Sequence, residues 1–587
     1  MDAASSASTT SASNGATGLP EASASTSKWH WLALLAVAAF AFLVVFYELG
    51  DFRALGSHEV YAVVPAREML ESGNWTVPTY GGLPRLEKPP LAYWIIAAST
   101  RALGELNTFT ARFPAAVSTL LLALLIGCWV GRWFGRTAGI VAAVVQVTSM
   151  YALIYARKAE IDMLLCLLTT SALCLVGSQN PAESRGRAFL RWTAIYALLA
   201  LSWMAKFHYG LAMVLGPCVV FYLVQKRYRD LRQLANPLGL AMLAAAIFVW
   251  PALLLRAVPE AASVWQEETV GRAVGFLGRK PIWFYLPQIL WMALPWTGLI
   301  LQAIPSSFRR AWRRPGPREV HFGLPLWRAG DARDRFMWVW FLVVFAIITI
   351  SADKHKHYAI AAMPMLSMLA GQQAAVIRRR AREGRRIVSP AMAIATCVLG
   401  IVSGVGLVLF VPGNWPELAA PTYIVSAVLA IGVCAIAWLL VKKKPTAAWC
   451  TCLVVFLGCY IPAIGWMVPA RDRWQVIANF ADDVRGALPA RQQDVAVYQM
   501  GMHAVVCYLD SPVHRLESLR DVKVELAQRG SLNVVTYEGK VGELRLAGPA
   551  RVMRHLPAGK ETTGFNTPSL VLVKLTPSRP RHPIAAH

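Results

Sequence analysis

The segment from Trp29 to Tyr47, WHWLALLAVAAFAFLVVFY, contains no Asp, Glu, Lys or Arg. A helix of about 18 to 22 apolar residues is long enough to cross the roughly 30 Å hydrocarbon core of a membrane. Similar blocks recur along the 587-residue chain, of which 56% is hydrophobic and only 16% charged. The sequence therefore predicts an α-helical, polytopic integral membrane protein.

We place thirteen spans along the chain, with an expected boundary error of a few residues. Nine of the ten cysteines lie inside apolar blocks, where a thiol behaves as a small hydrophobic group. Neither a disulfide framework nor redox chemistry is therefore expected. The predicted spans lie near residues 29–48, 113–132, 138–156, 160–178, 189–204, 208–224, 237–256, 284–304, 336–352, 357–376, 389–411, 421–441 and 446–468.

The formal net charge is +25, from 58 Lys and Arg against 33 Asp and Glu residues. The cations stand in short clusters between apolar blocks, a pattern typical of cytoplasmic membrane loops and not of a nucleic-acid-binding face. Every strong cluster follows an even-numbered span. With thirteen spans, this predicts a cytoplasmic amino terminus and an extracytoplasmic carboxyl terminus. The clusters occupy residues 132–136, 185–191, 226–232, 309–318, 378–386 and 442–444.

Three parts flank or interrupt the spans. Residues 1–28 are mostly Ser, Ala, Thr and Gly, and are expected to be a disordered tail rather than a signal peptide, because a charged leading region is missing. The outer loop at residues 51–112 contains two amphipathic stretches, VPAREML and PPLAYWIIAAST, which we expect to lie as helices in the membrane interface. Residues 469–587 alternate strand-like runs with polar helical stretches, which predicts a small α/β domain.

Four outer segments carry polar groups that a membrane protein rarely places there without a function. They are Gly56–Tyr61, Leu86–Pro90 (LEKPP), Arg157–Met163 (RKAEIDM) and Ser351–Tyr358 (SADKHKHY). In LEKPP, the two prolines fix the backbone and bar the preceding residues from helical geometry. The SADKHKHY segment is a cationic outer loop, which favours an anionic ligand.

Each segment alone also allows a simpler interpretation. Glu87 beside Lys88 fits an interfacial ion pair of small value, and Arg157 with Asp162 fits a helix cap. His355 and His357, flanked by lysines, fit solvated side chains better than metal ligands. The combination points further, because all four segments are expected on one side of the membrane, as a site at the lipid–water boundary requires.

The run from His58 to Trp94, HEVYAVVPAREMLESGNWTVPTYGGLPRLEKPPLAYW, resembles the first periplasmic loop of the lipid A aminoarabinose transferases and of the wider protein O-mannosyltransferase-like family. The segments ARFPAAVS, ARKAEIDM and SADKHKHYAIAAMP and the thirteen-span layout fit as well. The resemblance implies the GT-C glycosyltransferase fold, with about 13 transmembrane helices at residues 29–468 and a small C-terminal α/β periplasmic domain at 469–587. It also implies a bacterial inner-membrane location and a sugar donor linked to polyprenyl phosphate.

The family's functional residues carry over one at a time. Its EKPP acid and base fall on Glu87 and Lys88, and its aspartate at the start of the fourth span falls on Asp162. The lysine and tyrosine of its late outer loop fall on Lys354 and Tyr358. The arginine of its long outer loop falls most plausibly on Arg272.

One departure concerns the Asp-Glu pair that the family places after its first span. His58 and Glu59 stand at these positions, so the leading carboxylate is absent. Either Glu59 takes its role, or the acceptor is activated elsewhere, or the acceptor differs. The family's aromatic residue three positions before the EKPP lysine is Arg85 here, which also points to a different acceptor.

By resemblance, Lys88, Arg272 and Lys354, with Tyr358, are expected to bind the phosphate of the sugar donor. Asp162 or Glu59 is expected to act as general base, beside His58. The resemblance further implies that a divalent metal can sit between Glu87 and Asp162, since two carboxylates suit an oxygen-ligated ion. The apolar tail of the carrier would lie in a groove near Trp94 or Trp296.

Several functions stay open at this point. The sugar implied by the resemblance is 4-amino-4-deoxy-L-arabinose and the acceptor lipid A, but a mannosyltransferase-like enzyme acting on protein or another glycan fits the same residues. A secondary transporter would also have many spans, although we find no inverted repeat and the charges cluster outside. A scaffold that has lost catalysis is the third alternative, supported only by the missing aspartate.

Overall fold

The computed structural model of the chain describes residues 28–50, 55, 57–180, 183–267, 280–312, 330–351, 354–469, 476–488, 495–500, 505–509, 514–560, 566–567 and 569–577. Of the predicted amino-terminal tail, only Lys28 belongs to this set, as the first residue of a helix. Arg272 of the predicted phosphate-binding group lies outside the described residues.

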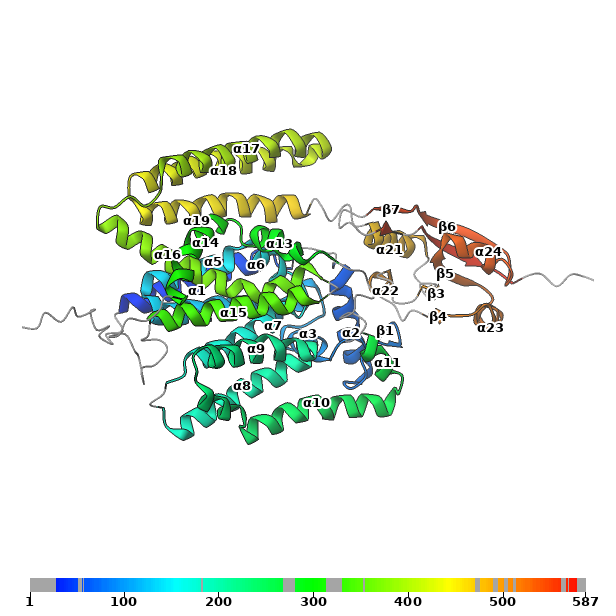
Figure 1. Cartoon of the computed structure of the whole chain (residues 1–587). Coiled ribbons are helices and arrows are strands. Elements are labelled where there is room, and N and C mark those ends of the chain that lie inside the picture. The colour runs from blue at the N-terminus through cyan, green and yellow to red at the C-terminus, as the bar shows by residue number, and fades with distance from the viewer. Residues whose placement is uncertain are drawn as a thin grey trace, which may run out of the picture.

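All thirteen predicted spans coincide with helical elements (Figure 1), although four of them consist of two consecutive elements. The α-helices of this part are α1 (Lys28–Phe46), α4 (Thr108–Phe134), α5 (Arg136–Thr148), α6 (Met150–Tyr155), α7 (Asp162–Gly177), α8 (Arg185–Lys206), α9 (His208–Val224), α10 (Pro237–Ala257), α11 (Ala261–Gln266), α13 (Tyr285–Met292), α14 (Thr297–Trp312), α15 (Gly330–Ile350), α16 (Met363–Arg382), α17 (Pro390–Asn414), α18 (Ala419–Val441) and α19 (Pro445–Pro462). Shorter turns are η1 (Tyr228–Leu234), η3 (Ile282–Phe284), η4 (Lys356–Ala362), η5 (Pro416–Leu418) and η6 (Ala463–Met467).

Among the described residues, seven helices are long and apolar enough to cross a membrane by themselves. An eighth span results if the pair Ile282–Met292 and Thr297–Trp312, bent by 118°, is counted as one. Other predicted spans, such as α5 and α9, are shorter apolar helices. The chain is therefore a polytopic helical membrane protein, and the number of thirteen spans stays a prediction.

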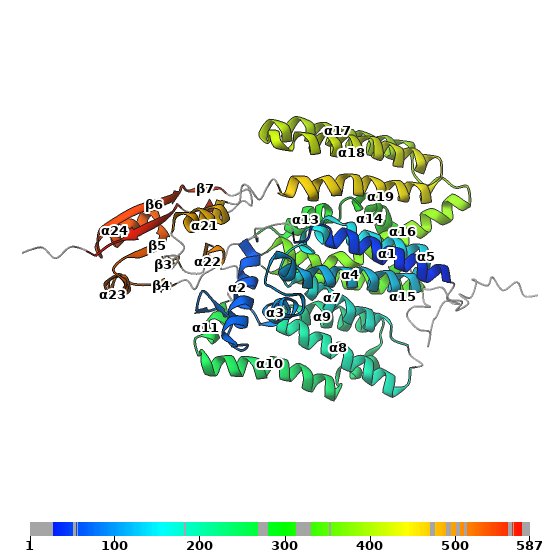
Figure 2. The same ribbon diagram turned by 180° about the vertical axis from the view of Figure 1, so that it is seen from behind.

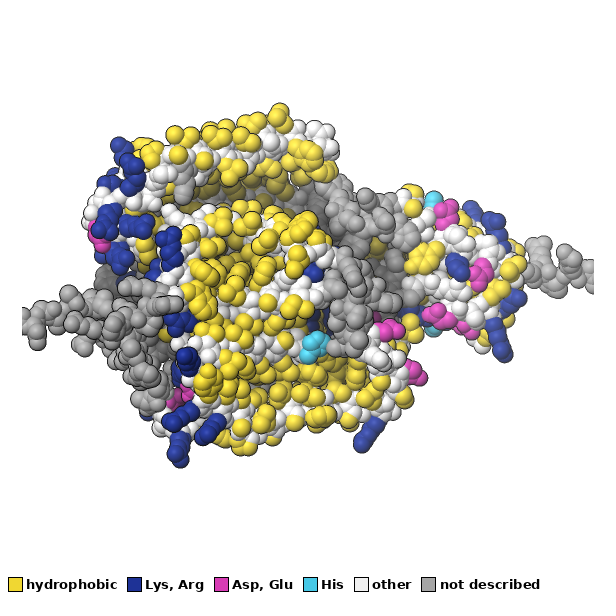
Figure 3. All heavy atoms as spheres, viewed as in Figure 1, with side chains coloured by type: hydrophobic (Ala, Val, Ile, Leu, Met, Phe, Trp, Pro, Cys, Tyr) yellow, Lys and Arg dark blue, Asp and Glu magenta, His cyan; other side chains and the backbone are white. Residues whose placement is uncertain are grey.

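The helical body has a basic end and an end that bears the C-terminal domain. Lys and Arg side chains gather at the end of the helices away from that domain (Figure 3). Helix α16 ends in Arg379, Arg380 and Arg382, and Lys442 to Lys444 follow α18. This arrangement agrees with the grouping of basic loops on one side, which the sequence predicted.

The core of the helical body lies where α4, α9 and α15 meet. Trp129 and Trp133 of α4 are buried, with ring centroids 6.1 and 6.0 Å from that of Phe336. Phe336 also makes an edge-to-face contact with Phe221, at 5.0 Å between centroids. Such aromatic contacts add directional attraction to the burial of apolar surface.

The outer loop forms two helices joined by a hairpin, as the amphipathic stretches predicted. Its elements are α2 (Ser57–Ser72), β1 (Thr79–Tyr80), β2 (Leu83–Pro84) and α3 (Leu91–Leu103). The hairpin turns at Gly81 and Gly82, whose φ angles are +58° and +79°. A two-residue turn with positive φ at both positions favours Gly-Gly, because side chains rarely adopt this backbone conformation.

The carboxyl-terminal part is a small α/β domain, again as predicted, and it extends from one end of the helical body (Figure 2). A five-stranded sheet of order β4-β3-β5-β9-β6 is parallel in its first three strands and antiparallel in the rest. The elements are α21 (Val476–Ala487), β3 (Val495–Tyr498), α22 (Val505–Tyr508), β4 (His514–Leu516), α23 (Leu519–Arg529), β5 (Leu532–Tyr537), η7 (Glu538–Lys540), α24 (Val541–Leu544), β6 (Ala550–Leu556), β7 (Gly559–Lys560), β8 (Asn566–Thr567) and β9 (Leu570–Leu575).

Candidate active site

The EKPP turn connects the hairpin to α3 and is held by Arg85. The guanidinium of this buried residue lies 4.6 Å from the ring centroid of Tyr61, and its Nε donates to the Tyr61 carbonyl oxygen at 3.2 Å. Arg85 Nη1 also donates to Glu87 Oε1 at 3.2 Å, while the buried Oε2 accepts no hydrogen bond from a described residue. Arg85 thus orients the acid of the turn, where the family has an aromatic side chain.

Lys88, the base of the EKPP turn, is a partly buried cation. Within the described residues, no hydrogen bond or ion pair joins its ammonium group to another side chain. Burial lowers the pKa of Lys88, and the neighbouring Lys206 lowers it further, whereas Asp162 and Glu160 act in the opposite direction. A buried ammonium that lacks a direct partner is costly, and an anionic ligand would offset that cost.

The RKAEID segment places two carboxylates near Lys88. Glu160 Oε1 lies 3.3 Å from Lys158 Nζ, and Asp162, the first residue of α7, lies 3.1 Å from Lys206 Nζ through its Oδ1. Burial raises the pKa of Glu160, and Lys158 partly offsets this. The site therefore alternates cations and carboxylates, as expected of a site that binds phosphate and moves a proton.

Lys206 was missed by the sequence analysis. It ends α8, and Phe207, with φ +42°, separates it from α9. Its Nζ lies 4.9 Å from the ring centroid of Tyr358 and 5.3 Å from that of Tyr209, whose hydroxyl donates to the Tyr358 carbonyl at 3.1 Å. A lysine in an outer loop, against the positive-inside trend, was the signal that could have revealed it.

Glu59 and His58 differ sharply in their surroundings. The Glu59 carboxylate is buried and accepts two hydrogen bonds from Arg112, at 2.8 and 3.0 Å, and one from the Ala159 amide at 2.9 Å. It therefore joins α2, α4 and the RKAEID segment. Burial and the nearby Lys88 lower the pKa of His58, which favours the neutral imidazole at neutral pH.

The late outer loop contributes Tyr358 to the site, but Lys354 is engaged elsewhere. Lys354 Nζ donates to the carbonyl oxygens of Ser351 at 2.6 Å and Lys280 at 3.3 Å, and the side chain is buried. The rings of His355 and His357 stack at 5.3 Å between centroids. In this arrangement Lys354 satisfies backbone carbonyls, and Lys88 and Lys206 are the lysines near Asp162.

The predicted metal position lies between the carboxylates of Glu87 and Asp162. In the described part of the chain, no group of three or more His, Cys, Asp or Glu side chains is placed to hold a metal ion. Glu87 Oε1 accepts from Arg85, and Asp162 Oδ1 pairs with Lys206, so both predicted ligands have cationic partners. Glu87 Oε2 is buried without a hydrogen-bond partner among the described residues, so the metal position between Glu87 and Asp162 stays a prediction.

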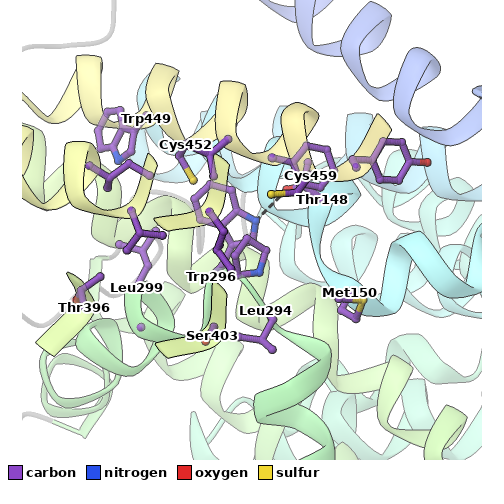
Figure 4. A pocket seen from close by; sticks show the side chains of 18 of the residues that line it. Thr148, Met150, Leu294, Trp296, Leu299, Thr396, Ser403, Trp449, Cys452 and Cys459 are labelled. Atoms are coloured by element: carbon purple, nitrogen blue, oxygen red, sulfur yellow. Dashed lines mark hydrogen bonds between the residues drawn. The ribbon is translucent and has the colours of Figure 1, made fainter. Parts of the chain in front are cut away.

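A large apolar cavity lies between the helical body and α17–α19 (Figure 4). Its volume is about 1240 Å³, and its lining includes Trp296, Leu407 and Trp449. Trp296 donates through Nε1 to Thr148 Oγ1 at 2.8 Å. The lining also reaches Tyr460, whose hydroxyl lies 3.3 Å from Nη1 of Arg157, the residue that begins the RKAEID segment. One end of the cavity therefore adjoins the RKAEID segment at Arg157.

Comparisons with known proteins agree with this architecture. The family model described as dolichyl-phosphate-mannose-protein mannosyltransferase matches residues 87–255. An undecaprenyl phosphate-alpha-4-amino-4-deoxy-L-arabinose arabinosyl transferase of Pseudomonas fluorescens is 25% identical over 484 residues, 78% of each chain. One of Sodalis glossinidius is 26% identical over 343 residues, and the match spans only 58% of either chain.

The fold is that of a solved transferase structure. The crystal structure of ArnT from Cupriavidus metallidurans bound to undecaprenyl phosphate matches with a TM-score of 0.72 at 20% sequence identity. The match covers 93% of this chain and 98% of that one. This chain is therefore similar in sequence to aminoarabinose transferases, and it has the fold of the solved transferase structure.

Proposed function

We propose that this protein transfers a sugar from a polyprenyl phosphate carrier to an acceptor at the outer face of the bacterial inner membrane. The relatives' names support undecaprenyl phosphate as carrier and 4-amino-4-deoxy-L-arabinose as sugar. Lipid A is the acceptor that the resemblance of the first outer loop implies. The orientation follows the basic loops, with the amino terminus in the cytoplasm and the C-terminal domain in the periplasm.

The observation that carries this proposal is Lys88. Its ammonium is partly buried at the outer end of the helices, lacks a paired carboxylate among the described residues and is close enough to Lys206 for the two charges to repel. A phosphate placed between these lysines would relieve their repulsion and make charge-assisted hydrogen bonds. Arg272, in the same predicted group, would add a third cation.

The chemistry then needs few further groups. An acceptor oxygen attacks the anomeric carbon, the bond from this carbon to the carrier's phosphate oxygen breaks, and the phosphate leaves with the electron pair. Lys88 and Lys206 would stabilise the negative charge that grows on the phosphate. For a hydroxyl acceptor, the proton passes to a carboxylate. We assign this role to Asp162, which among the described residues pairs with Lys206 through Oδ1 alone, because both oxygens of the Glu59 carboxylate accept from Arg112.

The apolar cavity supplies a place for the carrier's tail. It is lined almost entirely by hydrophobic side chains of spanning helices, and its Tyr460 end adjoins the RKAEID segment. The tail would leave lipid and not water, so van der Waals contact with the cavity wall would stabilise it there. Trp296, one of the two aromatic residues predicted near the tail, lines this cavity, whereas Trp94 is hydrogen-bonded to Trp75 O at 3.0 Å.

A protein or glycan acceptor is the second candidate. The match of residues 87–255 to the mannosyltransferase family favours a protein or glycan acceptor. His58 and Arg85 also differ from the residues expected at these positions in the aminoarabinose transferases. The transporter alternative has no comparable support.

Sugar transfer can be measured with the purified full-length protein in liposomes. The assay uses a radiolabelled polyprenyl phosphate sugar and offers lipid A, a protein substrate or no acceptor. We expect label to move to one acceptor, and Lys88→Met to reduce the rate by at least tenfold. The control Lys442→Met removes an exposed cation after α18 and should change nothing. Full transfer by Lys88→Met would contradict the phosphate site, and no transfer with any donor would contradict the proposed function.

A further inference from the structure

The hairpin at residues 79–84 leads directly into the turn that bears Glu87 and Lys88. On one side it is held by Glu68 of α2, whose carboxylate accepts from Thr79 Oγ1 and the Gly81 amide, both at 2.5 Å. The Gly82 amide donates to the same carboxylate at 3.3 Å. At its base, the Arg85 amide donates to the Pro78 carbonyl at 2.8 Å. The hairpin is therefore firmly attached to α2.

On its other side the hairpin is held by the C-terminal domain. Arg515 of β4 donates through Nη2 to the Tyr80 carbonyl at 3.1 Å and through Nε to the Gly81 carbonyl. A Cβ atom added at Gly81 would lie 2.4 Å from Arg515 Nη2, so a side chain at this position would displace the guanidinium from its place. The contact joins segments more than 430 residues apart in sequence.

The two parts of the protein also share a hydrophobic core at this place. The Tyr80 side chain is completely buried and packs in one cluster with Val60 and Val64 of α2 and with Phe480 and Val497 of the C-terminal domain. We therefore expect the hairpin to move together with the domain. Only three residues separate Pro84 from Lys88, so a shift of the hairpin is passed on to the turn.

We propose that Arg515 is a positioning residue for the transfer reaction, and that the C-terminal domain acts through it to hold the Glu87–Lys88 turn in register with Asp162 and Lys206. Arg515 itself touches no reacting atom. Only the expected effect on the rate of sugar transfer rests on the proposed function; the mechanical link between Arg515 and the hairpin does not. The physical basis is that a displacement of about 1 Å in a catalytic group can cost about 100-fold in rate, and that such groups need support from surrounding residues.

The first experiment compares Arg515→Ala and Arg515→Lys with Arg551→Ala, which removes an exposed arginine of β6 in the same domain. We expect Arg515→Ala to lower kcat by about 10- to 100-fold. The rise in KM for the sugar donor should be smaller, because the phosphate charge that Lys88 meets grows in the transition state. Arg515→Lys, which keeps the charge but not the two-pronged contact, should fall between. Arg551→Ala should match the wild type.

The second experiment needs no transferase activity. Hydrogen exchange of residues 79–88, followed by mass spectrometry on the full-length protein in detergent, should be faster in Arg515→Ala than in Arg551→Ala. Gly81→Ala and Gly82→Ala form a matched pair, since both lose a glycine with positive φ, but only at Gly81 does the new Cβ meet Arg515. Gly81→Ala should therefore resemble Arg515→Ala, and Gly82→Ala should show the smaller change.

The outcomes separate the two proposals. Faster exchange at residues 79–88 together with a lower kcat supports the positioning role. Faster exchange without any sugar transfer by the wild-type protein overturns the proposed function but leaves the mechanical link in place. The inference would be overturned if Arg515→Ala, or the milder Arg515→Lys, had the same hydrogen exchange and the same kcat as Arg551→Ala.

Discussion

Lys206 Nζ lies 3.1 Å from Asp162 Oδ1, and this ion pair joins the last residue of α8 to the first residue of α7. Both side chains are largely buried, with exposed fractions of 15% and 12%. Losing one partner of a buried pair leaves the other charge uncompensated, at a cost of up to about 3 to 5 kcal/mol. The pair therefore has a structural role in addition to any part in transfer.

We predict that Lys206→Met lowers both stability and transfer, whereas Lys206→Met combined with Asp162→Asn recovers stability but not transfer. The double variant carries no unpaired charge at this position, yet lacks the proposed base and one phosphate-binding cation. Thermal unfolding in detergent and the liposome assay measure the two effects. A double variant no more stable than Lys206→Met would show that the pair contributes little to folding.

Glu59→Gln should act on stability more than on chemistry. The substitution leaves the buried Arg112 without its counter-charge, which we expect to destabilise the protein by about 3 kcal/mol. Activity should then fall in proportion to the folded fraction, measured by size-exclusion chromatography. His58→Ala, on the neighbouring residue, is the comparison and should be milder. A well-folded Glu59→Gln protein with a greatly reduced kcat would instead identify Glu59 as the general base.

The pH dependence of carrier binding should reflect Lys88. Burial places the pKa of Lys88 below that of an ordinary lysine. Only the protonated form attracts phosphate, so affinity for polyprenyl phosphate is complete below this lowered pKa and is lost as the pH rises through it. Lys88→Arg, which stays charged, should bind with much less alkaline loss. Binding measured between about pH 6 and pH 10 tests this, and identical profiles for the two proteins would contradict it.

The cavity can be narrowed with a matched pair of substitutions on α17. Leu407 lines the cavity, whereas Leu409 has 75% of its surface exposed on the outside of the helices. We predict that Leu407→Trp weakens use of a long polyprenyl donor by about tenfold and spares a donor with a short prenyl chain, since only the long tail needs the volume. Leu409→Trp should affect neither. Equal effects of both substitutions on both donors would place the tail elsewhere.

Much of the architecture could be predicted, because hydropathy and helical period are local properties of the sequence. The helices at all thirteen predicted positions and the mixture of strands and helices after residue 469 illustrate this. The partners of charged groups could not be predicted in the same way. Lys206 meets Asp162 across 44 residues of sequence, and Lys354 donates to backbone carbonyls, which carry no side-chain signal. Resemblance placed Lys88 in the site, but only the structure shows that Glu59 is held by Arg112.

The cluster in which Tyr80 and Phe480 pack together has a consequence for how the protein is made. After Tyr80, the ribosome adds 400 residues up to and including Phe480. At a synthesis rate of roughly 5 to 20 residues per second, the first loop waits about 20 to 80 seconds for its partner. During that interval the apolar side chains of Val60, Val64 and Tyr80 are not yet packed against the C-terminal domain. Newly made chains should therefore depend on membrane chaperones at this stage, and ribosome pausing late in synthesis should prolong their exposure to proteases.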